Sequence, residues 1–394
     1  MKFNKWTLGL AAVGAVSLAS AARADEAKII PLQTALSNTT ISGYVDTAVQ
    51  YNAGNVGPSG DSYAPAGTQS SAVDSFSLND VDIAIDHPLD STPWAAGYHV
   101  DLNWGTQAVG YYGNDGYSPV RQGYVALSTP VGNGIQWKIG IMDDIIGYEG
   151  NTDASNPNYT RSIGYAIEPT TLLGLIGTYQ IDSMFTVQAG IAENYTTGPI
   201  AVGATPSSEE VSSKVFAGAV AFTAPDSWGF LKGATANAGV LISPFKGGAD
   251  NYYAGVTLPT PISALKVGAS FDLRSVANQA PGNSKNDSGF DVALYGNFQA
   301  TDKLSFNLRG EYFDLEGAVN PYAYGNIPAT ANGNGKGEEF TATLQYNLWA
   351  NVTSRAEFRW DHSDQGAAFG YNSLNGNSAT VNSYILALNV IYSF

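Results

Sequence analysis

The last thirteen residues, 382–394 (NSYILALNVIYSF), form the most restrictive pattern in the sequence. Side chains of a strand point alternately to its two faces. One face of this segment is apolar and aromatic, and it carries Tyr384, Leu386, Leu388, Val390, Tyr392 and Phe394. The other face is smaller or more polar, and it carries Ile385, Ala387, Asn389, Ile391 and Ser393. The segment is therefore a strand with one face against an apolar medium, and by itself it fits both a membrane barrel and a soluble sandwich.

The N-terminus predicts export. Residues 1–24 have Lys2 and Lys5, then an apolar run, then Ala22, Arg23 and Ala24. This order is typical of a cleaved signal peptide, and the run is too short for a committed membrane helix. We expect 25–40 to be a short periplasmic segment. No later apolar stretch approaches 18 residues, so a membrane location would require a closed barrel, since lipid tolerates no unpaired strand edge.

Sixteen segments alternate as strands do and are separated by breaks rich in Gly, Pro, Asn and Asp. They lie at 41–52, 76–87, 96–104, 120–128, 135–142, 171–181, 184–195, 213–223, 230–242, 250–258, 263–273, 289–299, 303–314, 338–348, 351–361 and 382–394. Short connections such as 182–183 and 349–350 alternate with long ones. Outer-membrane barrels have short turns on one side and long loops on the other. The pattern predicts an all-β, transmembrane antiparallel barrel over 41–394.

Residues 161–167 look like a further strand. Counting this segment would make the number of strands odd. It would also place short turns on the outer side of the barrel and long loops on the inner side for the rest of the chain. We therefore assign 143–170 to one connection, the third outer loop, which leaves 16 strands. A barrel of this size encloses a water-filled lumen.

Alternation also predicts which face is wet. In 351–361, Arg355, Glu357, Arg359 and Asp361 alternate with apolar residues, and Arg309 and Glu311 do so in 303–314, where Lys303 is also placed on the charged face. A charge on the lipid face costs several kcal/mol near the bilayer centre. These side chains should therefore line the interior. The six Trp beyond the signal lie at strand ends, as two aromatic girdles would require.

Composition excludes several classes. Without the signal's Lys2, Lys5 and Arg23, 15 basic side chains face 34 acidic ones, a formal charge of −19, which argues against a nucleic-acid partner. The chain has no Cys for disulfides, and we expect no metal and no cofactor. Only three His are present. Asp361, His362 and Ser363 are consecutive and so point to opposite sides, and no nucleophile motif is found. We expect no enzyme activity.

Several motifs carry a resemblance to a known family. They are FSLNDV at 76–81, VDLNWG at 100–105, RQGYV at 121–125, GYE at 147–149 and NPNYTRS at 156–162. With them the chain resembles the OmpL-like β-barrel porins, over roughly 40–200 at the level of motifs and elsewhere by strand pattern. The resemblance implies an outer-membrane location and a porin-like role, with outer-membrane lipid and lipopolysaccharide as surroundings. It implies no particular solute.

The third outer loop is the candidate site. It carries Ile145, Ile146, Ile163, Ala166 and Ile167, and a solvated loop has little use for so much apolar surface. We expect it to fold inward and narrow the pore, as in general porins; a loop capping the mouth is the alternative. The predicted constriction residues are Asp143, Asp144, Glu149, Asp153 and Arg161 from the loop with Arg309, Arg355 and Arg359 from the wall. Carboxylates at the constriction favour cations.

These patterns predict a porin for passive diffusion of small hydrophilic solutes, weakly preferring cations. The alternatives are a barrel whose surface loops bind a ligand or host glycan and, less in keeping with the pattern, a soluble β-protein. Tyr392 and Phe394 resemble the signal read by the barrel-assembly machinery. The sequence leaves open a homotrimer and calcium in the Asn-rich pieces 151–158 and 278–287.

Overall fold

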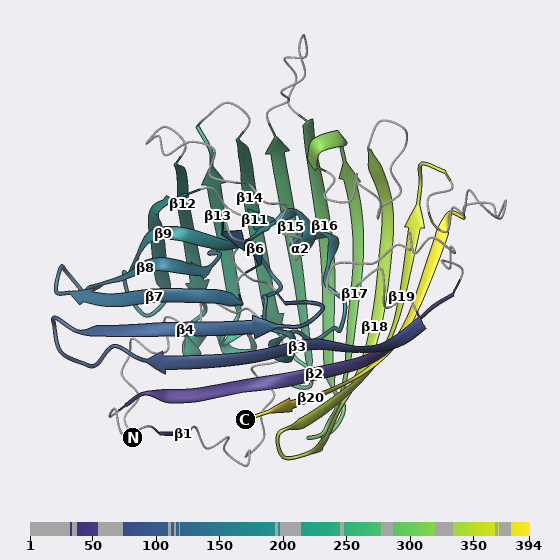
Figure 1. Ribbon diagram of the computed structural model, residues 1–394, viewed down its shortest axis with the longest axis horizontal. Coiled ribbons are helices and arrows are strands. Elements are labelled where there is room, and N and C mark those ends of the chain that lie inside the picture. The colour runs from purple at the N-terminus through teal and green to yellow at the C-terminus, as the bar shows by residue number, and fades with distance from the viewer. Residues whose placement is uncertain are drawn as a thin grey trace, which may run out of the picture.

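The computed structural model describes residues 32–33, 38–53, 74–108, 112–113, 116–117, 119–193, 196–197, 214–244, 248–276, 287–319, 334–366, 369 and 380–394. The chain is a closed antiparallel barrel of sixteen strands (Figure 1). It closes where β20 pairs with β2, from Ser393 opposite Tyr44 to Tyr384 opposite Ala53. The barrel fold predicted from alternation is confirmed. The predicted signal peptide 1–24 and most of segment 25–40 lie outside the described residues.

The barrel strands are β2 (Thr40–Ala53), β3 (Asp74–His87), β4 (Ala96–Trp104), β7 (Val120–Thr129), β8 (Ile135–Asp143), β9 (Pro169–Gln180), β10 (Phe185–Ala192), β12 (Val215–Thr223), β13 (Thr235–Ile242), β14 (Ala249–Pro259), β15 (Leu265–Val276), β16 (Asp287–Gln299), β17 (Leu304–Leu315), β18 (Gly335–Trp349), β19 (Val352–Ser363) and β20 (Asn382–Ser393). Short strands are β1 (Leu32–Gln33), β5 (Tyr112–Gly113), β6 (Gly116–Tyr117) and β11 (Thr196–Thr197). Helical turns are η3 (Asp153–Ser155), α2 (Ile163–Ile167), η5 (Asp226–Leu231) and η6 (Gly317–Val319). In the described part of the chain, no helix is long and apolar enough to cross a membrane.

Two expectations about local structure have different outcomes. The segment 161–167 is not a barrel strand, as predicted: it contains α2. The strand expected at 230–242 begins only at Thr235, because η5 occupies the start of the connection. Gly229 and Gly233 there have φ of 61° and 75°. This left-handed conformation favours glycine and ends an extended strand.

The faces follow the predicted alternation. On β19, Arg355, Glu357 and Arg359 are buried on the inside, whereas Phe358 is 37% exposed on the outside. On β20, Leu388 is 57% exposed while its neighbour Ala387 is buried. The exception is Lys303, which lies exposed in the turn before β17 and not on the inner wall.

The chain terminus closes the barrel. Phe394 N–H donates to Gly43 O at 2.9 Å, and Gly43 N–H donates to Phe394 O at 3.1 Å. A β-carbon at residue 43 would lie 2.9 Å from Phe394 Cζ and would also meet the backbone of Asp82. Glycine therefore allows β2 and β3 to approach the last residue closely. Tyr392 is half-exposed on the lipid-facing side.

Candidate functional site

The connection between β8 and β9, residues 144–168, is called the third loop below. Its partners are inward-facing residues of strands spread around the barrel, from β2 to β19. In Figure 1, α2 of this loop is seen among the strands and beside β15 and β16, with which it has contacts. The loop therefore lies against the inner wall.

The first part of the loop, 144–148, packs on an apolar part of the wall. Ile145 and Ile146 contact a cluster contributed by β8, β9, β10, β12 and β13: Met142, Leu172, Ile176, Ala192, Val215, Ala217 and Leu241. The Tyr148 ring stacks on Tyr295 with 4.0 Å between centroids, and its hydroxyl bonds Thr257 Oγ1 at 3.0 Å. These contacts are mainly non-directional, so they hold the loop by area and shape.

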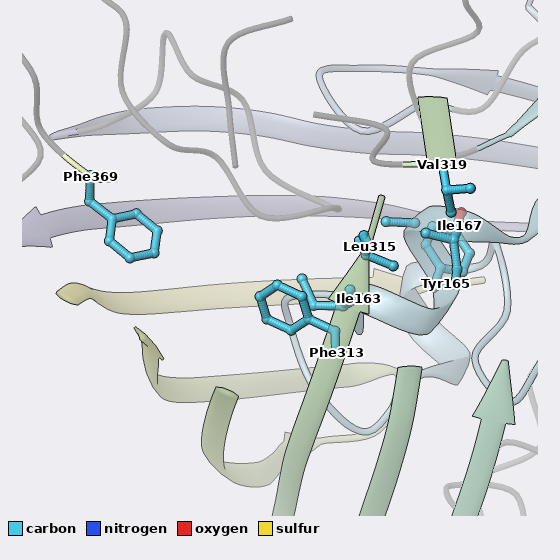
Figure 2. Packing of buried hydrophobic residues seen from close by; sticks show 8 residues of the cluster. Ile163, Tyr165, Ile167, Phe313, Leu315, Val319 and Phe369 are labelled. Atoms are coloured by element: carbon cyan, nitrogen blue, oxygen red, sulfur yellow. The ribbon is translucent and has the colours of Figure 1, made fainter. Parts of the chain in front are cut away.

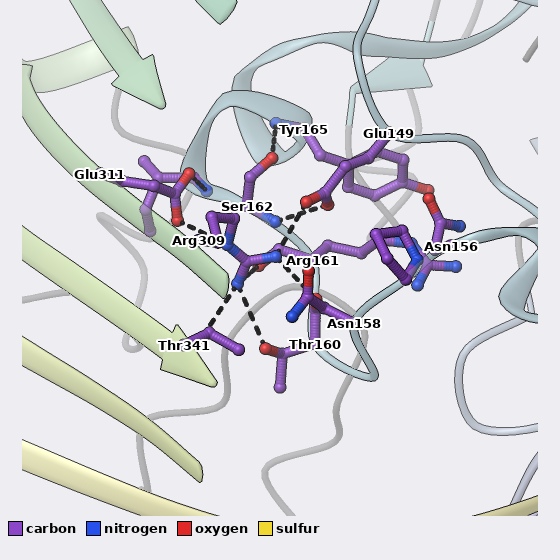
Figure 3. A network of polar contacts seen from close by, with 12 residues as sticks. Glu149, Asn156, Asn158, Thr160, Arg161, Ser162, Tyr165, Arg309, Glu311 and Thr341 are labelled. Carbon is purple, nitrogen blue, oxygen red and sulfur yellow. Dashed lines mark hydrogen bonds and ion pairs between the residues drawn. The ribbon is translucent and has the colours of Figure 1, made fainter. Parts of the chain in front are cut away.

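The next part, 149–162, is held by charged groups of β17 to β19. Figure 3 shows Arg309 and Glu311 of β17 beside this part of the loop. Arg309 is fully buried, and its Nη1 donates to Glu149 Oε1 at 2.8 Å and to Thr160 O at 2.9 Å. The same guanidinium lies 3.2 Å from carboxylate oxygens of Glu311 and Glu339 on the wall. Arg309 thus binds three buried carboxylates, one from the loop and two from the wall, with its rigid fork of donors.

Backbone groups of the loop also find their partners on the wall. Glu357 accepts from the N–H of Tyr159 at 2.5 Å and of Thr160 at 2.9 Å. Arg359 Nη1 donates to Arg161 O at 2.7 Å, and Arg355 Nη1 donates to Asp153 O at 3.1 Å. The peptide groups of a buried loop need hydrogen-bond partners, although the loop has no neighbouring strand to pair with. Side chains of β19 are partners for four of these groups.

The last part of the loop contains α2, which packs near the outer end of β17 (Figure 2). Ser162 caps it by accepting from Tyr165 N–H at 2.9 Å. The apolar residues Ile163, Tyr165, Ala166 and Ile167 form a buried cluster with Phe313, Leu315, Val319 and Phe369. At the end of the helix, Ile167 O accepts from Asn251 Nδ2 at 2.9 Å. All five apolar residues that suggested an inward loop therefore contact the wall.

The predicted loop acids lie in different surroundings. Asp143 is the last residue of β8, its side chain is 32% exposed, and it accepts from Arg121 Nη1 at 2.7 Å. Asp144 accepts the N–H of Ile145, and loss of water around it raises the pKa of its carboxyl. Glu149 and Asp153 are buried, and Asp153 pairs with Arg161 at 2.5 Å. Of these four acids, Asp143 is the one whose charge is best placed to be reached by solutes.

The wall arginines are partners of the loop itself. Arg309, Arg355 and Arg359 are at most 3% exposed and donate to loop atoms. Arg309 and Glu149 touch, so they do not face one another across an open gap. That these arginines shape a pore constriction stays a prediction. If they do so, they act by holding the loop in place.

Two acidic groups were not singled out from sequence. Asp82 and Asp101 on β3 and β4 share Arg121, which also pairs with Asp143. Asp272 and Asp291 are direct neighbours on β15 and β16, and both are buried beneath α2. Alternation along each strand is consistent with Asp82, Asp272 and Asp291 on the inner face, but no sequence pattern indicates which charges meet.

The structure bears on two other predictions. Asn156 bonds the backbone of Gly150 and Thr152 through its amide group, so in the piece 151–158 it stabilises a turn. Most of the piece 278–287 lies outside the described residues. Asp361 is buried inside the barrel, whereas its neighbour His362 lies on the outward face, as alternation requires.

Comparison with known proteins identifies the family. The model of the family "Putative beta-barrel porin-2, OmpL-like" matches residues 38–394. The chain belongs to this family. It is therefore a porin-family barrel of the outer membrane. No curated protein matches it significantly in sequence.

Solved structures share the fold at low identity. The outer-membrane channel DcaP of Acinetobacter baumannii has a TM-score of 0.57 and 11% identity, over 90% of this chain and 97% of that one. The anion-selective porin from Comamonas acidovorans has a TM-score of 0.57 and 12% identity, over 90% and 99%. The trimer form of OmpT, an outer-membrane protein of Vibrio cholerae, has a TM-score of 0.56 and 13% identity, over 90% and 99%. These likenesses concern the fold alone.

Proposed function

We propose that this porin-family barrel is a passive diffusion pore for small hydrophilic solutes, narrowed by the third loop and weakly selective for cations. The observation that carries the proposal is the position of residues 144–168 against the inner wall, held from β2 to β19. A loop held inside a barrel of sixteen strands reduces the cross-section open to solutes. Size is then the main filter, with charge adding a weaker preference.

The sign of the preference depends on which charges solutes can reach. The inner-wall arginines 121, 309, 355 and 359 are at most 4% exposed, and each donates to a carboxylate or to loop backbone. Asp143 keeps about a third of its side chain exposed and lines a cavity together with Asn151 and Asn237. Among these four arginines and the predicted acids of the third loop, the more accessible charge is therefore the acidic one of Asp143, which supports cation preference. The Comamonas porin is described as anion-selective, but at 12% identity the likeness concerns the fold alone.

Reversal potentials in a KCl gradient across a planar bilayer test this proposal. The parent should prefer K⁺, and the preference should weaken as salt rises because the Debye length is only about 8 Å at physiological ionic strength. Asp143→Asn should reduce it. Asp302→Asn is the matched control, since Asp302 lies exposed in the turn between β16 and β17. Chloride preference in the parent, or equal effects of both substitutions, would contradict the proposal.

A barrel that mainly binds a surface ligand remains the competing function. Its distinguishing property would be the absence of steady single-channel conductance in the folded parent. We also propose that the chain has no enzyme activity, in keeping with its porin family.

Further expectations complete the proposal. The chain is exported with cleavage after Ala24, and the barrel-assembly machinery reads Tyr392 and Phe394. Deleting Phe394 removes both backbone bonds to Gly43 and should reduce folded protein in the outer membrane without changing the conductance of the molecules that fold.

Lipopolysaccharide surrounds the outer rim. A homotrimer is consistent with the trimer form of the Vibrio structure, and crosslinking in membranes would detect it.

A further inference from the structure

The outward face of β18 to β20 carries aromatic side chains near the outer ends of these strands. Phe340 pairs with Trp360, and Trp360 pairs with Tyr384, so aromatic side chains stand in one row across β18, β19 and β20. Phe340 and Tyr384 are 40% and 41% exposed. Such a row is typical of the girdle at a membrane interface. The next residues outward along these strands therefore lie at the level of the lipid headgroups.

That next row contains Glu338, His362 and Asn382. Glu338 is the direct cross-strand partner of His362, and His362 is the partner of Asn382. Asp364 follows β19 just beyond, where its N–H donates to Lys336 O at 3.0 Å. One ligand atom each from Glu338, His362 and Asp364 lies within 4.8 Å of the other two.

The hydrogen bonds of Asn382 determine the tautomer of His362. Trp360 Nε1 donates to Asn382 Oδ1 at 2.8 Å, and an indole N–H is only a donor, so the amide atom there is the oxygen. His362 Nδ1 lies 2.9 Å from the same oxygen. An oxygen accepts but does not donate, so Nδ1 carries the hydrogen. In the neutral ring, Nε2 then carries the lone pair.

Nε2 faces acceptors. It lies 3.8 Å from Asp364 Oδ1, which is longer than a hydrogen bond, and the carboxylate of Glu338 completes the group. The neighbouring cation, Lys336, lies 3.4 Å from Asp314 and over the ring of Tyr312. The lone pair and the two carboxylates repel one another at this separation, and a cation between them would offset that repulsion. Protein ligands bind zinc at about 2.0–2.2 Å, so atoms sharing one ion are separated by roughly 3–4 Å.

We propose that Glu338, His362 and Asp364 bind one divalent metal ion of the zinc class at the outer rim. An imidazole with two carboxylates is a donor set suited to zinc and its transition-metal neighbours. Asn382 is a positioning residue, because its bond to Nδ1 orients Nε2 toward the metal. Three protein ligands would leave one position of a tetrahedral zinc ion open. The site is independent of conduction, since it lies on the outside of the wall.

The test is titration of the untagged, folded barrel with ZnCl₂ in detergent after treatment with a chelator, followed by calorimetry. The parent should bind one equivalent at this site. His362→Ala should weaken that binding at least 10-fold, and Asn382→Ala should weaken it by 10- to 100-fold. His87→Ala is the control: His87 lies at the opposite end of the barrel, beside Thr39 and Tyr98. Heat-modifiable gel migration reports folding for every variant.

Two results would overturn the proposal. One is zinc binding that His362→Ala leaves unchanged, which would place the ion elsewhere. The other is absence of a one-equivalent site in the folded parent, which would mean that these three side chains bind no metal. NMR of the His362 ring, with and without ZnCl₂, separates these cases: zinc should shift the ring signals in the parent, and they should stay unchanged if the ion binds elsewhere or not at all.

Discussion

The third loop is held by two unlike parts of the same wall. Its start, 144–148, rests on apolar and aromatic side chains of β8 to β16, with Ile146 and Tyr148 as the main contacts. Its middle, 149–162, is bound by buried charges of β17 to β19 through named donors and acceptors, with Arg309 at the centre. Apolar packing tolerates small shifts, whereas charged hydrogen bonds define one position. We infer that the first part stabilises the loop by burying apolar surface, and that the second part determines the position of the loop in the lumen.

The largest expected effect is on the charged side. Arg309→Met would leave Glu149, Glu311 and Glu339 buried without their shared cation, and breaking such a network costs about 3–5 kcal/mol. The urea midpoint of unfolding should fall, and single-channel conductance should rise or fluctuate as the loop loses its position. Lys232→Met is the control, because Lys232 pairs with Asp226 in the open. Equal behaviour of the two variants would remove Arg309 from this account.

A smaller effect is expected beneath α2. A β-carbon at residue 164 would lie 2.7 Å from Asp272 Oδ2 and 3.1 Å from Asp291 Oδ2. Gly164→Ala should therefore displace the helix or the carboxylates, at about 1–3 kcal/mol for such overpacking. Gly150→Ala, in the same loop, meets its nearest atom only at 4.0 Å and should leave the urea midpoint unchanged. A neutral Gly164→Ala would show that the loop is not seated as closely as described.

The smallest effect is expected on the apolar side. Ile146 is half-buried, so Ile146→Ala should cost about 1–2 kcal/mol, less than the roughly 2–5 kcal/mol of a fully buried position. Conductance should change little, because the charged contacts still fix the loop. If Ile146→Ala raised the conductance as much as Arg309→Met, the apolar contacts would fix the loop as firmly as the charged ones, which would contradict this account.

The sequence was sufficient for the barrel and its faces. Alternation in 351–361 placed Arg355, Arg359 and Phe358 correctly, because a strand allows only two directions for a side chain. It could not show that Arg309 meets Glu149, since 160 positions separate them and only the closed barrel brings them together. The sequence analysis also treated the wall arginines 309, 355 and 359 as charges lining the open pore. Burial of their guanidinium groups against the loop depends on the path of the loop through the lumen, which has no local signature.

The same limit explains the error at 230–242 and the outer-rim cluster. Two glycines with positive φ, Gly229 and Gly233, delay the start of the strand to Thr235, and glycine composition alone does not reveal φ. The group formed by Glu338 and His362 depends on the register between β18 and β19, which alternation within one strand does not specify.

The position of the third loop inside the lumen is the central claim, and a crosslink tests it most directly. Asn158 Nδ2 of the loop donates to Thr343 Oγ1 of β18 at 2.7 Å, and the chain has no native cysteine to react. In folded barrels, Asn158→Cys with Thr343→Cys should join through a short bifunctional thiol reagent. Asn158→Cys with Leu344→Cys should not, since Leu344 is exposed on the outward face. Absence of the first crosslink in correctly folded protein, or equal yield of both, would contradict the account.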